Sequence, residues 1–314
     1  MKSLNRLLIS SAIVAAFALA AFAQTTPPAA TPAAPATQCD EQTNIRLYEE
    51  WRNKRTGDAE AQKLAYAAGK EYLEKCTGTA DAAYINAVKK WVDRYESVTV
   101  EYSYQQAITG NNTQEAFRLG RQLSTANPQR VELYTQLAWL GYTASAAPTN
   151  ATDAYNAEAE RLARRALDLI QSGQQPQCVD AQGKAAPCWA PFNTREDLVG
   201  GLNFALGHFA SKSRRHEEAA TYFHAAAQQN GFTKTTASTY ANLAAAYAAN
   251  AEYRRLIQEY DSLVKANPDA AGTDQAKAIL ARVDPHTDRI IDAYARAVAL
   301  ATDPKLAAQK ADWM

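Results

Sequence analysis

Three histidines, His208, His216 and His224, are the residues whose type and spacing come closest to a metal site. A zinc site of the HExxH kind places two histidines four residues apart on one helix face, and the chain contains no HExxH. His216 and His224 are eight residues apart, which separates them by about 80° around a helix. His208 belongs to a different expected helix. The spacing therefore favours polar surface histidines, and we expect no metal and no cofactor.

Other patterns that carry chemistry are missing from the sequence. The chain has no GxSxG, no glycine-rich phosphate loop and no Cys-x-x-Cys, which argues against a serine nucleophile, a nucleotide site and a redox or zinc-ribbon motif. Most carboxylates stand beside Lys or Arg on expected exposed helix faces, as is typical of a solvated helix surface. Most of the 16 tyrosines recur at helical packing steps, which indicates core filling. We predict that the protein is not an enzyme.

The four cysteines predict two disulfides if the chain folds in an oxidising compartment. One expected helix begins just after Cys39 and its antiparallel partner ends near Cys76, so a Cys39–Cys76 bridge would join two neighbouring ends. Cys178 and Cys188 lie in one loop, which a Cys178–Cys188 bridge would order. Four free thiols are the alternative.

Residues 1–23 have the pattern of an export signal. Lys2 and Arg6 give a positive start, an apolar segment follows, and Ala-Phe-Ala at 21–23 offers the small residues that a signal peptidase reads. We expect cleavage after this segment, and hence a periplasmic or secreted protein without a stable membrane span. An uncleaved anchor is the alternative, because an apolar run of about 17 residues is near the lower limit for spanning a bilayer.

Composition sets limits on the partners of the exported chain. Residues 24–38 hold four prolines, which favour an extended, solvated linker. Basic and acidic residues number 33 each, so loss of Lys2 and Arg6 leaves a net charge near −2. Such a chain has no basic field for nucleic acid and no polybasic segment for anionic lipid. Beyond the linker, abundant Ala with sparse Gly and Pro is typical of closely packed helices.

Two stretches, 200–233 and 237–270, share one spacing of small and large apolar residues. The residues that carry it are Leu206, Gly207, Ala219, Phe223 and Ala226 in the first, and Tyr240, Leu243, Ala244, Tyr247, Leu256, Tyr260 and Leu263 in the second. In both, a small residue precedes the first contact position of the next helix by twelve. Steps of three and four residues predict two antiparallel helices packed face to face.

This pattern resembles the tetratricopeptide repeat, a helix–turn–helix unit of 34 residues. The resemblance implies an all-α fold, an α-solenoid of antiparallel helical hairpins over residues 39–314, and a non-enzymatic scaffold that binds a protein or peptide partner in a concave groove. In the two stretches, the positions that line the groove in this family are occupied by Phe204, His208, Ser211, Ser238, Ala241 and Ala245. The basic and Asn residues that grip a C-terminal carboxylate in this family are largely missing here, so we do not expect binding of a free C-terminus.

The remaining elements follow from local signals. Residues 41–55 and 59–75 predict a divergent first hairpin. Residues 80–109 lack Gly and Pro, and predict either one long helix or two segments that bend at the β-branched residues 98–100. Asp284-Pro285 and Asp303-Pro304 each place a cap residue before a first-turn proline. The helix after Pro285 is expected to cap the end of the array.

Residues 172–193 interrupt the helical pattern with several glycines and prolines. A loop of this length is uncommon in a compact domain and is often functional. One hypothesis is a connector that packs Trp189 over a groove. Another is the functional loop of an enzyme or metal-binding protein. For the whole chain, a structural envelope component that self-assembles through the exposed ends of the array is a further alternative.

The register of the first stretch generates a test of packing. Ala226 is expected at a close helix contact, so Ala226→Leu should overpack it and lower the free energy of unfolding by about 1–3 kcal/mol. Chemical denaturation of the two proteins measures this difference, and an unchanged melting temperature would contradict the placement.

Overall fold

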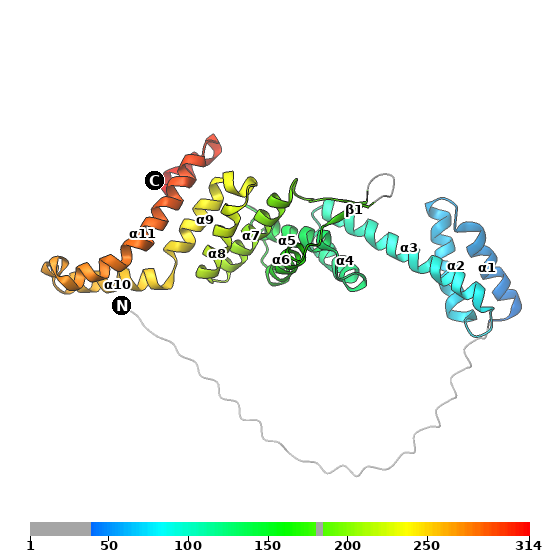
Figure 1. The fold of residues 1–314 in the computed structure, drawn as a ribbon. Coiled ribbons are helices and arrows are strands. Elements are labelled where there is room, and N and C mark those ends of the chain that lie inside the picture. Colours follow the sequence, from blue (N-terminus) through cyan, green and yellow to red (C-terminus); the bar gives the residue numbers. More distant parts are fainter. Residues whose placement is uncertain (1–38, 180–184) are drawn as a thin grey trace, which may run out of the picture. The chain divides into compact units, whose positions relative to one another are not determined.

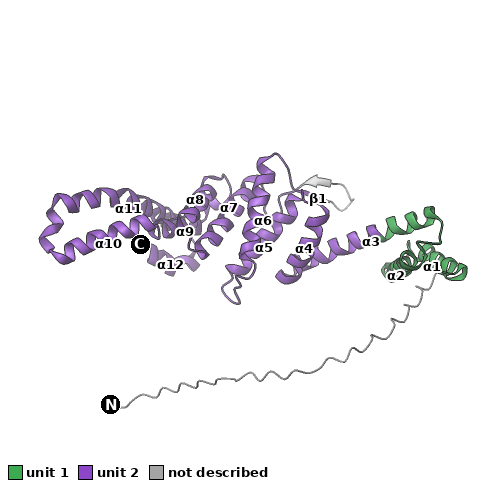
Figure 2. Ribbon diagram, turned by 90° about the horizontal axis from the view of Figure 1, so that it is seen from below, with its two compact units in different colours: residues 1–92 green, residues 93–314 purple. Residues whose placement is uncertain are grey.

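The computed structural model describes residues 39–179 and 185–314. The export signal and the linker, residues 1–38, therefore lie outside the described residues. Twelve α-helices make up most of the described chain, and one two-stranded ladder accompanies them. The expected predominance of helix is confirmed. The chain divides into two compact units, residues 1–92 and residues 93–314 (Figure 2).

The first unit is built on a helical hairpin of α1 (Glu41–Lys54) and α2 (Ala59–Cys76), which pack against each other. The carboxylates of Asp40 and Asp58 begin the two helices, because each accepts a backbone N–H three residues further on. The core of this unit contains the buried residues Leu47, Trp51, Ala65, Ala68, Tyr72, Val88 and Val92. The predicted first hairpin is thus confirmed.

The predicted Cys39–Cys76 disulfide is present, with the two Cα atoms 4.9 Å apart. It joins the residue before α1 to the last residue of α2. The bridge closes the open end of the hairpin, opposite the turn that connects the two helices, and so restricts the unfolded chain at the point where the helices would otherwise separate.

α3 (Ala82–Thr109) is a single helix. It continues through the β-branched residues 98–100, so the first of the two expected alternatives is correct. Its C-terminal end is followed by Asn111 in the left-handed region, with a φ of 53°. Asn112 then begins the next helix, because its side-chain oxygen accepts the backbone N–H of Glu115.

In the second unit each helix from α4 to α9 packs on the next one along the chain (Figure 1). These helices are α4 (Thr113–Ala126), α5 (Val131–Ser145), α6 (Asn156–Gln171), α7 (Arg195–Lys212), α8 (His216–Gln228) and α9 (Ala237–Ala248). The ladder of β1 (Gln177–Val179) and β2 (Ala185–Pro187) lies between α6 and α7 in the sequence, and a 3-10 turn, η1 (Phe232–Thr235), precedes α9. The expected irregular loop 172–193 therefore contains a short antiparallel ladder.

Small residues set the spacing of α7 and α8, as the sequence pattern predicts. A Cβ atom placed on Gly207 would lie 2.7 Å from the ring of Phe223. Ala219 and Ala226, on the same helix as Phe223, are fully buried. The large side chain of α8 thus fills the space that the missing side chain of α7 leaves, and the helices approach closely there.

The predicted face-to-face hairpin over 237–270 is wrong. α9 packs mainly against α11 (Asp274–Leu300), while α10 (Ala251–Ala266) leaves α9 and lies along the first half of α11 (Figure 1). The reason is which apolar residues pack together. Leu256 of α10 is buried with Ile279 and Val283 of α11. Leu243 and Ala244 of α9 are instead buried in a cluster that includes Ala293, further along α11.

The expected helix start at Asp284-Pro285 is also wrong, because Pro285 lies inside α11. Proline removes a backbone donor and disfavours the middle of a helix. Packing offsets this cost on both sides of the proline: Ile279 and Val283 join the α10 core, and Ala293 and Ala297 are buried against helices that include α9. The expected C-terminal capping helix is thus part of one long helix.

The second expected cap, Asp303-Pro304, is confirmed. The Asp303 carboxylate accepts the backbone N–H of Lys305 at a distance of 2.9 Å. The 3-10 turn η3 (Pro304–Leu306) leads from there into the short terminal helix α12 (Ala307–Trp313). A further 3-10 turn, η2 (Pro268–Gly272), connects α10 to α11.

The close contact at Gly207 predicts an unusual response to a helix-favouring substitution. Alanine has the higher helix propensity by about 1 kcal/mol, yet Gly207→Ala should lower the free energy of unfolding by about 1–3 kcal/mol, because the new methyl group meets Phe223. Denaturation with urea measures the change. Gly272→Ala, where no atom lies within 4 Å of the added Cβ, is the control and should not destabilise. A Gly207→Ala protein as stable as the parent would contradict the packing.

Candidate functional site

The six predicted groove residues do not lie on one surface. Phe204 is 7% exposed, and both Phe204 and His208 pack against the ring of Tyr142 from α5, with ring centroids 5.6 and 5.2 Å away. Ser211 is half-buried near the end of α7. The prediction that these three residues line a groove with the other three is therefore not met. The resemblance places them on an open face, and at Phe204 and His208 this face is covered by Tyr142 of the preceding hairpin.

Ser238, Ala241 and Ala245, in contrast, line one open groove on α9. We call it the α9 groove. Its lining residues are Thr236, Ala237, Ser238, Ala241, Asn242, Ala245, Tyr294, Leu306, Gln309 and Trp313, and its volume is about 470 Å³. The floor consists of small side chains, so the helix backbone lies near the surface. Tyr294 of α11 and Trp313 of α12 supply the large apolar walls.

Sequence reasoning missed the walls of the α9 groove. Tyr294 and Trp313 come from helices that are distant from α9 in the sequence, and no local pattern connects them to it. The one signal for α12 was the Asp303-Pro304 cap, which predicts a helix start but not its position. In the structure α12 is held near α11, where Lys310 donates to the carbonyl of Ala301 at 3.3 Å.

His208 takes part in a polar cluster with Ser145 and Asp153. The hydroxyl of Ser145 donates to Asp153 Oδ1 at 2.6 Å, and His208 Nε2 lies 2.9 Å from the same hydroxyl oxygen. Since the one hydroxyl proton goes to Asp153, the histidine Nε2 must be the donor to Ser145. Asp153 also accepts from Lys212 Nζ at 3.3 Å. The cluster joins the loop before α6 to both α5 and α7.

Serine, histidine and aspartate also form catalytic triads, but the order of the hydrogen bonds among them is different here. In a triad the histidine stands between the serine and the carboxylate and accepts the serine proton. In this chain the serine stands in the middle, its proton points to the carboxylate, and its side chain is almost fully buried at 3% exposure. The arrangement fixes the loop and does not activate Ser145 as a nucleophile.

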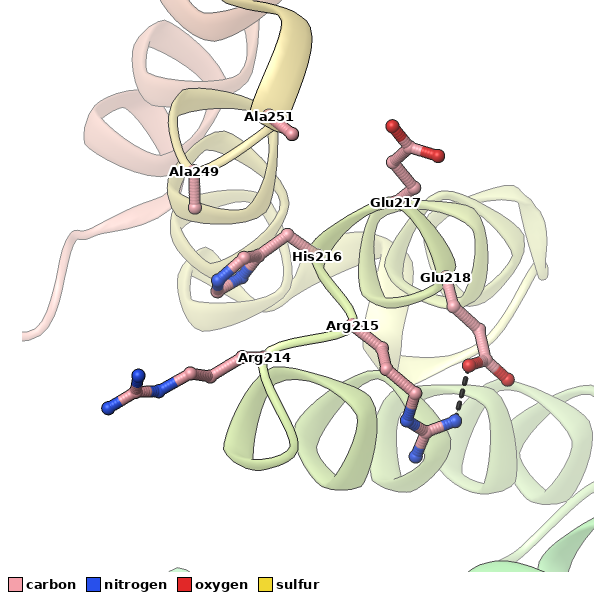
Figure 3. Close-up of a pocket in the computed structure, with 7 residues that line it drawn as sticks. All are labelled: Arg214, Arg215, His216, Glu217, Glu218, Ala249 and Ala251. Atoms are coloured by element: carbon pink, nitrogen blue, oxygen red, sulfur yellow. Dashed lines mark hydrogen bonds and ion pairs between the residues drawn. The ribbon is translucent and has the colours of Figure 1, made fainter. Parts of the chain in front are cut away.

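A second hollow lies at the turn between α7 and α8, and Figure 3 shows its lining of mixed charge. Arg215 pairs with Glu218 there, and it also reaches Glu160 of α6 at 2.6 Å. Arg164 contacts both glutamates, at 2.5 and 2.6 Å. Glu160 is buried rather than on an exposed charged face, and a buried carboxylate is stable only when it is paired. These charges therefore neutralise one another and connect α6 to α8.

The same contacts determine the direction in which the pKa of the Glu218 carboxyl is shifted. Burial alone would raise the pKa of this carboxyl, but the hydrogen bonds from Arg164 and Arg215 outweigh it and hold the pKa below its ordinary value. Glu218 is thus a permanently charged partner near neutral pH. It is not suited to accept a proton in a reaction.

The three histidines weighed as metal ligands lie in different places. His208 is in the Ser145 cluster, His216 lines the hollow of Figure 3, and His224 lies on the face of α8 toward α11. Over residues 39–179 and 185–314, no group of three or more His, Cys, Asp or Glu side chains could hold a metal ion.

The loop 172–193 is closed on itself by a disulfide, and its C-terminal part packs on the core. The predicted Cys178–Cys188 disulfide is present, with Cα atoms 5.6 Å apart. Phe192 packs against Trp139 and Phe232, and a Cβ on Gly201 would lie 2.4 Å from its ring. Trp189 also packs against the main core of the second unit. The described part of the loop thus behaves as a connector that covers α5 and α7.

Within the described residues, none of the helices combines the length and the apolar character that a membrane crossing requires. No family model matches the chain, and no curated protein matches it significantly in sequence.

The position of His208 predicts a pH dependence of stability. Burial lowers the pKa of His208 and nearby Lys212 lowers it further, while Asp153 opposes the shift. The unfolded chain therefore binds a proton at a higher pH than the folded one. The contribution of His208 to the free energy of unfolding is therefore fully present above its unfolded pKa of about 6.5, and it is lost as the pH falls through its pKa in the folded protein.

Melting temperatures measured between pH 7.5 and pH 5 test this expectation. His208→Gln should lose less stability over the interval than the parent protein, because the titrating group is gone. His224→Gln removes an exposed histidine and should follow the parent. Parallel curves for all three proteins would contradict the role of His208.

Proposed function

We propose that this chain is a non-enzymatic helical scaffold, similar to tetratricopeptide-repeat proteins, that binds a segment of a partner protein in the α9 groove. The observation that carries the proposal is the groove itself. The repeat register alone predicts three groove residues on α9, namely Ser238, Ala241 and Ala245. These three residues line one open hollow with aromatic walls. Small floor residues let a peptide approach the helix, and apolar walls provide area for its side chains.

Successive close contacts at glycine support a repeat architecture in the second unit. Gly120 of α4 faces the large Leu137 of α5, Gly141 of α5 faces the small Ala159 of α6, and Gly207 faces the large Phe223. One helical hairpin cannot bury its apolar face alone, so a neighbour must stack on it. We propose an α-solenoid for this reason, with α11 taking the place of a regular second helix beside α9.

The two disulfides support an extracytoplasmic location. Disulfides persist mainly in oxidising compartments, and all four cysteines of this chain are paired in two bridges. The export pattern of residues 1–23 is consistent with this location. We therefore propose a periplasmic or secreted protein whose partner is an exported protein or peptide.

The lining of the α9 groove indicates the chemistry of the segment it would bind. Tyr294, Leu306 and Trp313 offer apolar and aromatic surface, while Asn242 and Gln309 offer amide groups that can pair with a peptide backbone. No charged side chain lines the groove among the described residues. The expected ligand is an uncharged segment that buries one or two apolar side chains.

Site-directed photo-crosslinking in the native envelope tests the proposal. A photoreactive amino acid at the exposed position Ala245 should give an adduct with a discrete partner, because that position faces the groove. The same amino acid at Ala278, an exposed alanine of α11 outside the groove, is the matched control. Ala245→Arg should reduce capture of the partner about tenfold or more, since a long cation would fill the groove.

The controls distinguish the possible outcomes. Adducts at Ala245 that are lost in the presence of excess unlabelled protein support the groove. Identical adducts at both positions, or none at Ala245, would overturn the proposal. An adduct between two copies of this chain would favour the self-assembling envelope component instead.

A further inference from the structure

The face of α9 opposite the α9 groove lines a separate cleft. Successive helix residues are about 100° apart, so Ser238, Ala241 and Ala245 point to one side of α9. Tyr240, Leu243 and Tyr247 lie roughly 180° away on the same helix. These residues form part of two adjoining hollows, of about 580 and 340 Å³, bounded by α8 and α11. The two hollows share His224, Tyr247 and Arg289, and we call them together the α8–α11 cleft.

Basic side chains line both hollows of the cleft. Lys234 and Arg296 line one hollow and Arg289 lines both, while the imidazoles of His224 and His286 stand beside them. Along α11 the segment from His286 to Arg296 covers about 15 Å. The cleft is thus an elongated trough with positive groups at intervals, which is the shape of an extended ligand and not of a compact one.

The acidic groups of the cleft are already engaged within the protein. Asp292 Oδ2 pairs with Arg296 Nε at 3.0 Å, and Glu217 accepts from the side-chain amide of Asn250 at 3.2 Å. Lys234 has only a neutral partner, the side-chain oxygen of Asn230 at 2.9 Å. In the part of the chain that the structure describes, no side chain forms an ion pair or hydrogen bond with Arg289.

An exposed arginine without a carboxylate partner, at the middle of a trough, is available to an anion from outside. Guanidinium groups bind carboxylates in a two-pronged geometry. Arg289 and Arg296 are seven residues apart on α11, which is about 10 Å along the helix. An extended polyproline-type segment repeats its side chains on one side every three residues, or about 9 Å. Two carboxylates with this separation would reach both arginines, one at the unpaired Arg289 and the other at Arg296 in competition with Asp292.

We propose that the α8–α11 cleft binds an acidic, extended polypeptide segment with two carboxylates three residues apart. A polypeptide fits better than a nucleic acid, because nucleic-acid binding needs a broad basic field and this chain carries equal numbers of basic and acidic residues. The half-buried ring of Tyr247 suits the carbons of a peptide, while Tyr240 and Leu243 are largely buried and contribute only small parts of the floor. This cleft is a second surface, independent of the α9 groove.

Fluorescence anisotropy with a labelled synthetic peptide tests the proposal on the full exported chain. The probe is a proline-rich nonapeptide with two glutamates three residues apart, and the control peptide has glutamines in their place. Arg289→Glu should weaken binding of the acidic peptide about tenfold or more. Lys277→Glu makes the same change of charge on α11 at an exposed residue outside the cleft, and it should leave binding unchanged. Circular dichroism checks that both variants fold.

Each outcome has a defined meaning. Tighter binding of the acidic peptide than of the glutamine peptide, lost in Arg289→Glu alone, supports the proposal. Equal binding of the two peptides, or equal loss in both variants, overturns it. Displacement of the peptide by inorganic polyphosphate at lower concentration, with the same dependence on Arg289, would assign the cleft to phosphate ligands. Ala245→Arg should not alter peptide binding, so failure of the α9 groove and failure of the cleft are separable.

Discussion

The packing of α9 between α8 and α11 is the constraint on which both proposed surfaces depend. α8 packs against α9 and α11 does so as well, and two opposite faces of α9 each line a hollow, although Tyr240, Leu243 and Ala241 on these faces are themselves largely buried. One face carries small uncharged residues and the other carries tyrosines next to arginines. If α10 had folded back on α9, as the repeat spacing indicates, it would occupy the position that α11 takes. The long α11 instead brings Tyr294 to one face and Arg289 to the other.

Local signals were sufficient to predict most of the helices, with the exception of α11, which begins before the expected start at Pro285. Asp40 and Asp58 cap α1 and α2, and the small residue Gly207 faces Phe223 at the predicted register. The cysteine pairing followed from hairpin geometry alone, because a tight turn at one end leaves the other ends adjacent. In such cases the contact partners lie within about 40 residues, and the sequence pattern directly reflects the packing.

The partner of α9 could not be predicted in this way. The apolar residues of α10 pack with Ile279 and Val283 of α11, and the spacing within 237–270 carries no information on partners that lie outside it. Two of the groove candidates were misplaced for a different reason, because Tyr142 of the preceding hairpin covers Phe204 and His208. The identification of the repeat family itself stays a prediction.

Native-state hydrogen exchange measures the central claim most directly, because it reports which helices open together. If α9 is held by α11, amides of α9 and of the C-terminal half of α11 should share one opening free energy. Amides of α10 should open separately, together with the N-terminal half of α11. Exchange of α9 in step with α10, independent of the C-terminal half of α11, would contradict the packing and remove the basis for both surfaces.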